Sequence, residues 1–216
     1  MSAVVLLVHG AFAETSIWAD VIAMLRRERI EAIAVANPLS GLTSDATYVA
    51  SLARSMGGPV VLGGHGYGGA VISAAAAENV VGLVYVAAFA PAVGETCVRL
   101  LEPRVLEALR PGVVRDGAVE LDVRADAYAG LLGGEAALQR PVVARAFDEP
   151  APVARWERVA SWFVVAARDA FLAPERQRAM AARAGGAVVE LDAAHDVART
   201  HPREVAEMFL RATRRT

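Results

Sequence analysis

The stretch of sequence that decides the fold is Val60-Val61-Leu62-Gly63-Gly64-His65-Gly66-Tyr67-Gly68-Gly69-Ala70. It begins with apolar, β-branched residues typical of a buried strand and continues with small residues that suit a buried helix. The chain must turn sharply between the two, and small residues are needed two positions before and after the apex, because strand and helix nearly touch there. Gly64 and Gly68 meet this need. The apex residue, Gly66, is expected to have a strained backbone conformation, which would direct a side chain at this position above the sheet.

On both sides of this stretch, short apolar runs alternate with amphipathic segments, which indicates a mostly parallel sheet with helices on both faces. We expect six strands, at Ala3–Val8, Glu31–Val35, Val60–Gly63, Val81–Val86, Trp162–Ala166 and Ala187–Leu191. We expect helices at Ser16–Glu28, Thr43–Met56, Gly68–Glu78, Glu175–Arg183 and Pro202–Arg211. The predicted fold class is therefore α/β.

The segment from Pro91 to Pro152 breaks this alternation. It is rich in proline and in glycine pairs, and it contains only short amphipathic pieces such as Arg104–Leu109. We interpret residues 91–152 as an insertion of short helices that forms a lid over the carboxyl edge of the sheet. Because this insertion is too short and too broken for a second domain, residues 1–216 are expected to form a single domain.

Composition narrows the class of protein. Of the 216 residues, 55% are hydrophobic, 21% are charged and the net charge is −2 without a basic block, which gives no support to nucleic-acid binding. No apolar run has the length of a membrane span, and the N-terminus lacks the pattern of a signal peptide. Cys97 is the only cysteine, so an internal disulfide is excluded and a cytoplasmic protein is expected. Nothing in the sequence indicates an oligomeric state.

The glycine-rich turn is not interpreted as a phosphate-binding loop. A Walker loop requires a lysine, and all 22 basic residues of this chain are arginine. A dinucleotide fingerprint would follow the first strand, where this chain has His9-Gly10-Ala11-Phe12 instead. No group of His, Asp and Glu has metal-ligand spacing. We therefore expect no cofactor and no metal, and a small molecule as the partner.

Four stretches resemble the α/β-hydrolase superfamily, specifically its compact bacterial esterase-like branch related to hydroxynitrile lyases and plant methyl esterases. They are Val8-His9-Gly10-Ala11-Phe12, the turn around Gly66, Tyr85-Val86-Ala87-Ala88-Phe89-Ala90-Pro91, and the region from Asp169 to His195. The resemblance implies an α/β-hydrolase fold. It also implies that Gly66 stands at the position of the nucleophile, where the superfamily has serine.

The superfamily's chain order is nucleophile, acid and histidine. Asp169 follows the strand predicted at Trp162–Ala166, and His195 follows the strand predicted at Ala187–Leu191, so both are expected at carboxyl ends of strands. The resemblance implies that His195 is a general base or acid and that Asp169 fixes its tautomer.

The resemblance also implies an oxyanion hole and a pocket. The hole would use the backbone N–H groups of Tyr67 and of Ala11 or Phe12. For a small, largely apolar carbonyl compound, the candidate pocket walls are Phe12, Tyr67, Phe89, Tyr128, Leu131, Leu132 and Trp156. His65 is expected to point away from the pocket into the scaffold. Asp196 either changes the local polarity beside His195 or faces solvent.

Glycine at position 66 changes the expected chemistry, because a serine hydroxyl forms the acyl-enzyme in an ordinary hydrolase of this type and glycine has none. Three interpretations remain open. The first is an enzyme that uses a His–Asp general base and an oxyanion hole without an acyl-enzyme, as a lyase, decarboxylase, cyclase or catalyst of direct water attack. The second is an engineered, inactivated variant of a serine carboxylesterase, and the third is a non-catalytic binding protein.

Overall fold

The computed structural model describes residues 3–115 and 117–215. Within these residues the main sheet has six strands in the order β2-β1-β3-β4-β8-β9, and every neighbouring pair runs parallel. The strands are β1 (Val4–Val8), β2 (Ala32–Val35), β3 (Val60–Gly66), β4 (Val80–Ala88), β8 (Ser161–Ala166) and β9 (Ala187–Leu191). The α/β prediction and the six predicted strands are confirmed. The nearly continuous apolar runs of β1, β3, β4 and β8 form strands that are covered on both faces, whereas the edge strand β9 is partly exposed.

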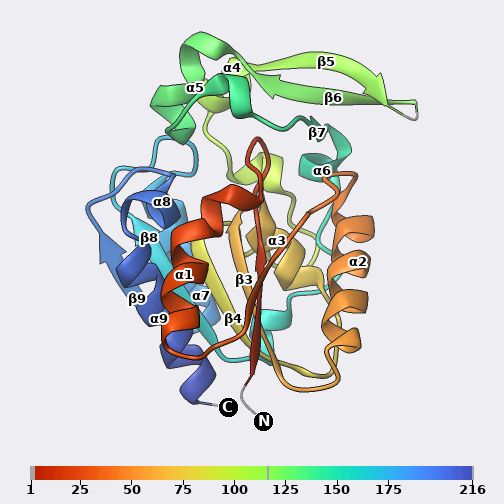
Figure 1. The fold of residues 1–216 in the computed structure, drawn as a ribbon. Helices are drawn as coiled ribbons and strands as arrows, with labels where there is room; N and C mark the ends of the chain where they lie inside the picture. Colours follow the sequence, from red (N-terminus) through yellow and green to blue (C-terminus); the bar gives the residue numbers. More distant parts are fainter. Residues whose placement is uncertain (1–2, 116, 216) are drawn as a thin grey trace.

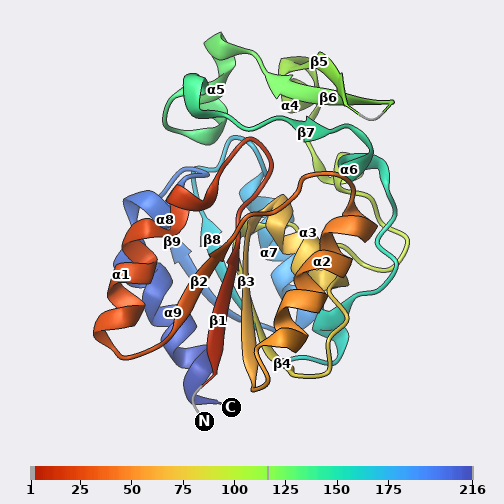
Figure 2. The same ribbon diagram turned by 45° about the vertical axis from the view of Figure 1, so that its right-hand side comes forward.

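Helices cover both faces of this sheet, as Figures 1 and 2 show. One face carries η1 (Thr15–Trp18), α1 (Ala19–Arg27), α8 (Val197–Thr200) and α9 (Pro202–Arg214). The other face carries α2 (Leu42–Ser55), α3 (Tyr67–Ala74) and α7 (Pro174–Ala184). Each of the five predicted helices is present, and the largest boundary error is at α3, which ends at Ala74. No helix in the described ranges is long and apolar enough to cross a membrane.

The lid lies between β4 and β8, above the carboxyl edge of the sheet (Figure 1). Its helical pieces are η2 (Cys97–Leu100), α4 (Pro103–Ala108), α5 (Ala125–Leu132), η3 (Ala136–Leu138) and α6 (Arg145–Asp148), and η4 (Arg155–Glu157) follows the lid before β8. The described part of the lid also contains a three-stranded antiparallel sheet of β5 (Leu109–Arg115), β6 (Ala118–Val123) and β7 (Val142–Val143).

The prediction of an insertion made only of short helices was therefore wrong for residues 109–123. Prolines and glycines in this part of the chain suggested broken helices. The run Val119-Glu120-Leu121-Asp122-Val123 alternates apolar and acidic side chains, however, and this period of two is that of a strand. β6 follows this pattern and pairs with β5 on one side and β7 on the other.

Candidate active site

The sharp turn occurs where β3 ends at Gly66 and α3 begins at Tyr67. Gly66 has φ 52° and ψ −123°, a conformation that residues with a side chain rarely adopt. A β-carbon on Gly64 would overlap the backbone of Gly68, and one on Gly68 would overlap the carbonyl oxygen of Val8. Helix α3 therefore packs against β3 at Gly64 and against the end of β1 at Gly68, which is why the sequence has glycine at these positions.

His195 and Asp169 are brought to this turn from two loops that follow β9 and β8. Both side chains are buried, and His195 Nδ1 lies 2.8 Å from Asp169 Oδ2. Because a carboxylate only accepts, Nδ1 carries the proton and donates it. The other ring nitrogen, Nε2, faces the apex, where a β-carbon on Gly66 would lie 3.1 Å from it. The structure thus brings together the three residues that the sequence indicated.

The carboxylate of Asp169 is held by four donors. Its Oδ1 accepts the backbone N–H groups of Phe171, at 2.8 Å, and Leu172, at 2.9 Å. Its Oδ2 accepts His195 Nδ1–H and also the side-chain amide of Gln177, at 2.7 Å. These hydrogen bonds hold the carboxylate in a fixed orientation. The direction in which His195 presents Nε2 is thereby set.

Gln177 is a positioning residue that sequence reasoning missed. It is buried on α7, and besides Asp169 it bonds two backbone groups, the N–H of Ala166 and the carbonyl of Leu172. The buried residues of α7 are Gln177, Met180 and Ala181, which are spaced as the apolar stripe of a helix. A glutamine on such a stripe requires buried polar partners, and that pattern was the available signal.

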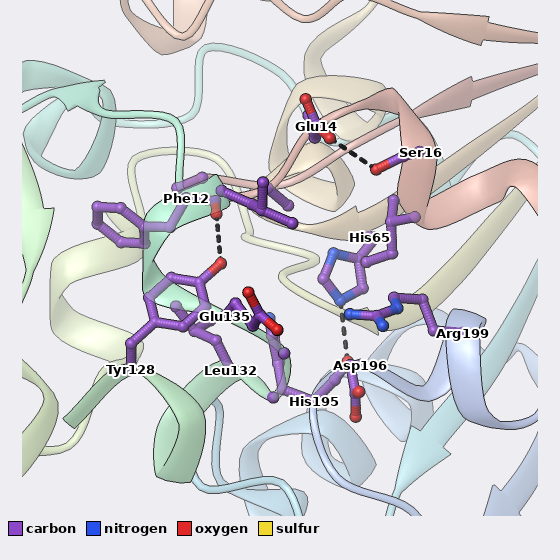
Figure 3. A pocket seen from close by; sticks show the side chains of 16 residues that line it. Phe12, Glu14, Ser16, His65, Tyr128, Leu132, Glu135, His195, Asp196 and Arg199 are labelled. Carbon is purple, nitrogen blue, oxygen red and sulfur yellow. Dashed lines mark hydrogen bonds between the residues drawn. The ribbon is translucent and has the colours of Figure 1, made fainter. Parts of the chain in front are cut away.

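The prediction that His65 points away from the pocket into the scaffold holds only in part, because its ring packs edge-on against buried Trp18 and also borders the pocket. Its side chain lines the pocket, the centres of its ring and that of His195 are 4.5 Å apart, and Nε2 donates to the His195 carbonyl at 2.9 Å (Figure 3). His65 follows the alternation of β3, because Val61, Gly63 and His65 all face the side of the sheet that carries Trp18 and Phe209. Burial lowers the pKa of His65 well below its usual value, so the ring is neutral.

The turn after β1 supplies the candidate oxyanion donors. Ala11 and Phe12 line the pocket, and Phe12 has φ 61°, in the left-handed region. A β-carbon on Gly10 would overlap the carbonyl of His65 and would lie 3.3 Å from the backbone nitrogen of Tyr67. The turn therefore packs directly on the apex, with the N–H of Tyr67 at the start of α3 beside it.

The pocket has a volume of about 280 Å³ and opens above His195 (Figure 3). Its lining comprises Ala11, Phe12, Ala13, Glu14, Ser16, Ile17, His65, Tyr128, Leu132, Gly133, Gly134, Glu135, Leu138, His195, Asp196 and Arg199. Phe12, Tyr128 and Leu132 were among the predicted walls. Asp196, whose place was open, also belongs to this lining, beside Gly133. The lining combines apolar side chains such as Ile17 and Leu132 with the charged residues Glu14, Asp196 and Arg199, so the pocket is less apolar than expected.

Four predicted pocket walls lie elsewhere. Phe89 is fully buried in the core, and Tyr67 is buried with its hydroxyl donating to Asp45 Oδ2 at 3.0 Å. Trp156 lies on η4 outside the pocket, and its indole N–H donates to the carbonyl of Pro91 at 3.0 Å. Leu131 packs against the hydrophobic cluster that includes residues of the lid. Consecutive residues of a helix point about 100° apart, so Leu131 faces away from the pocket that Leu132 lines.

Two lid side chains bond to the turn after β1. The hydroxyl of Tyr128 donates to the carbonyl of Phe12 at 2.8 Å, and Arg140 Nη1 lies 3.3 Å from His9 Nε2. His9 Nδ1–H donates to the Gly10 carbonyl at 2.9 Å. The lid thus supports the segment that carries the candidate oxyanion donors. Within the described residues, no group of three or more His, Cys, Asp or Glu is arranged to hold a metal.

His9 makes the stability of the fold sensitive to acid. Burial lowers its pKa from 6.5 to about 4, so the unfolded chain binds this proton at a higher pH than the folded protein does. Lowering the pH from about 7 to about 5 should reduce the free energy of unfolding by about 2 kcal/mol through this residue. We expect urea unfolding of His9→Gln to show a weaker pH dependence than the parent by that amount. A slope changed equally by His201→Gln, which alters a histidine outside the pocket, would contradict this assignment.

Comparisons with known proteins agree with this architecture. Residues 5–208 match the profile of the alpha/beta hydrolase family. A pyrethroid hydrolase from Sphingobium faniae superposes with a TM-score of 0.85 at 22% identity, over 99% of this chain and 98% of that chain. Polyneuridine aldehyde esterase gives a TM-score of 0.82 at 16% identity, over 98% and 99%.

A methylesterase from Arabidopsis, MES16, gives a TM-score of 0.79 at 17% identity, over 99% of this chain and 100% of that chain. At these identities the similarity concerns the fold. No curated protein sequence matches the chain significantly. The family follows from the profile match, which spans the chain from the first strand to the last helix: this protein belongs to the alpha/beta hydrolase family.

Proposed function

We propose that this protein is an enzyme that acts on a small ester or related carbonyl compound, with His195 and Asp169 as a general-base pair and without an acyl-enzyme. The observation that carries the proposal is a buried His–Asp pair, held by the four hydrogen bonds of the Asp169 carboxylate, in which His195 Nε2 faces Gly66. A general base needs its acceptor nitrogen directed at the reacting group, and this geometry provides it. An ester is supported as the substrate class by the superposed structures, which are a pyrethroid hydrolase, polyneuridine aldehyde esterase and a methylesterase.

In the proposed reaction, His195 Nε2 takes a proton from the attacking or breaking group, and Asp169 stabilises the resulting imidazolium. The N–H groups of Tyr67 and of Ala11 or Phe12 would hold the negative charge that develops on the carbonyl oxygen. In a serine hydrolase, loss of the nucleophile costs on the order of 10⁶ in kcat, and roughly 10³–10⁴ over water survives from the oxyanion hole and binding. The proposed enzyme would use this remaining catalysis and would form no covalent acyl-enzyme.

A second candidate function is that of a serine hydrolase inactivated at its nucleophile, with glycine replacing serine. One observation favours it: a β-carbon on Gly66 would lie 3.1 Å from His195 Nε2, so a serine hydroxyl there would come within reach of the histidine once the ring moves back by a few tenths of an ångström. The two candidates differ in whether the protein as it stands catalyses a histidine-dependent reaction.

The test is His195→Ala assayed beside the parent on p-nitrophenyl acetate, ethyl acetoacetate and small hydroxylated methyl esters. We expect the parent to turn over at least one of these classes and the variant to lose about 10²–10⁴ in kcat/KM, the usual contribution of general-base catalysis. His201→Ala is the matched control, because it removes a histidine that does not line the pocket. A parent that binds these compounds and shows no histidine-dependent turnover would identify a binding protein instead.

A further inference from the structure

The ring of Phe147 packs against two residues that carry candidate oxyanion donors. Its centre is 6.1 Å from the ring centre of Phe12, at an interplanar angle of 22°, and 5.9 Å from the ring centre of Tyr67, at 53°. Both separations are typical of packed aromatic pairs, and all three side chains are buried. Phe12 belongs to the turn after β1, Tyr67 begins α3, and Phe147 lies on α6 of the lid. One lid side chain therefore joins both donor segments.

The backbone of Phe12 depends on such contacts. Its φ of 61° lies in the left-handed region, which is unfavourable for a residue with a side chain and persists only where the surroundings hold it. Besides Phe147, the Phe12 ring contacts Phe171, with ring centres 6.2 Å apart, and the Phe12 carbonyl accepts the hydroxyl of Tyr128. We therefore expect a change in the packing of this ring to move the turn that includes the N–H groups of Ala11 and Phe12.

The side chain of Tyr67 is held at two places. Its hydroxyl donates to Asp45 Oδ2 at 3.0 Å, and its ring contacts Phe147. Asp45 is itself fixed, because it is buried in the first turn of α2 and its Oδ1 accepts the N–H of Ser40 at 3.0 Å. Since Tyr67 is the first residue of α3, the placement of this side chain also constrains the N–H group at the start of the helix.

Helix α6 is attached to the same end of α2. Arg145 Nε donates to the carbonyl of Ser40 at 2.6 Å, and Glu149 Oε2 accepts the N–H of Thr43 at 2.9 Å. These bonds join the lid to the scaffold on either side of Phe147. The position of the Phe147 ring is thus set by the scaffold, and Phe147 does not belong to the lining of the described pocket.

We propose that Phe147 is a positioning residue that sets the spacing between the oxyanion donors on Tyr67 and on Ala11 or Phe12, through the side chains of Tyr67 and Phe12. This rests on the proposed function, in which these donors hold the developing negative charge. Removing one oxyanion donor costs about 10²–10³ in kcat, and misplacing a catalytic group by about 1 Å can cost about 10²-fold. A smaller side chain at position 147 would leave space into which both rings can shift.

The experiment measures hydrolysis of p-nitrophenyl acetate by Phe147→Ala, made in the parent and in the Gly66→Ser background. We expect kcat/KM to fall by about 10–100-fold. Phe163→Ala is the matched control, because Phe163 is 3% exposed against 2% for Phe147, belongs to the same hydrophobic cluster and stacks on Tyr85. It should lose comparable thermal stability but stay within about threefold in kcat/KM. Phe147→Leu, which keeps most of the volume, should lose less than Phe147→Ala and serves in its place if Phe147→Ala does not fold.

A second measurement separates the alignment of the donors from stability. Each variant is also assayed on O-(4-nitrophenyl) thionoacetate, in which sulfur replaces the carbonyl oxygen and the leaving group is unchanged. Because sulfur accepts weaker hydrogen bonds than oxygen, aligned donors favour the oxygen ester. We expect the ratio of the two rates to shrink by about tenfold in Phe147→Ala and to stay unchanged in Phe163→Ala.

Two results would overturn the inference, and they differ in what they say about the proposed function. If turnover depends on His195 but Phe147→Ala loses no more activity and no more oxygen preference than Phe163→Ala, Phe147 only fills the core and the proposed function stands. If neither the parent nor Gly66→Ser shows turnover that depends on His195, the proposed function and the inference both fail. Should Gly66→Ser alone be active, the proposed function fails, and the comparison of Phe147→Ala with Phe163→Ala in that background still decides the inference.

Discussion

Gly66→Ser is expected to raise hydrolysis of p-nitrophenyl acetate by about 10⁴-fold or more over the parent, because loss of the nucleophile costs on the order of 10⁶ in a serine hydrolase. The reason is geometric. A β-carbon at this position would lie 3.1 Å from His195 Nε2, which places a serine hydroxyl within hydrogen-bond reach of the base. His195 is already oriented by Asp169, so no further part of a catalytic triad is lacking.

The measurement is the initial rate of p-nitrophenolate release, with the burst of an accumulating acyl-enzyme as a second signature. Gly66→Ala provides the matched control, since it adds the same β-carbon without the hydroxyl and should stay near the parent. The combination of Gly66→Ser with His195→Ala should also stay near the parent. A gain that survives the loss of His195 would disprove activation of the new hydroxyl by this histidine.

Asp169→Asn is expected to lower kcat of the histidine-dependent reaction by about 10³–10⁴-fold, because the same change in the triad of a serine protease lowers kcat by about 10⁴-fold. The carboxylate accepts four hydrogen bonds, including His195 Nδ1–H. An asparagine has only one acceptor oxygen, and when its amide group faces the ring the proton moves to Nε2. The nitrogen that faces Gly66 would then carry a hydrogen and could no longer act as a base.

The assay uses the parent's own reaction and, independently, ester hydrolysis in the Gly66→Ser background. Asp192→Asn is the matched control, because it makes the same chemical change at an exposed carboxylate that pairs with Arg168 on the surface. Folding is followed by thermal unfolding, since Asp169 also caps the backbone of Phe171 and Leu172. Full activity in a folded Asp169→Asn protein would show that the His–Asp pair has no catalytic role.

The fold and the central site were largely predictable because their signals are local. The spacing of Gly64, Gly66 and Gly68 reports a contact between a strand and a helix that adjoin in sequence. Parallel strands place their carboxyl ends at one edge, so Asp169 and His195 could be assigned to the same place from strand order alone. The structure brings these residues within hydrogen-bond distance.

The rest depended on packing between distant segments. Whether Leu131 or Leu132 lines the pocket is set by the rotation of α5, which the sequence of a short lid helix does not determine. His65 meets His195 because the loop after β9 lies against the end of β3, where His65 Nε2 donates to the His195 carbonyl. The role of Gln177 depends on a loop folding back over α7 to present Asp169 to it. In each case the decisive contact joins residues whose relative placement follows only from the complete fold.

The two hydrogen bonds from the lid to the turn after β1 have a thermodynamic consequence. Tyr128 holds the carbonyl of Phe12, a residue with positive φ, and Arg140 holds His9. Lifting the lid would break both bonds and release the backbone segment that is to receive the developing charge. In the proposed reaction, covering the substrate and aligning the candidate oxyanion donors would therefore be one equilibrium. A ligand that stabilises the closed lid would thereby also align the backbone segment with the candidate oxyanion donors, and lifting the lid would release that segment.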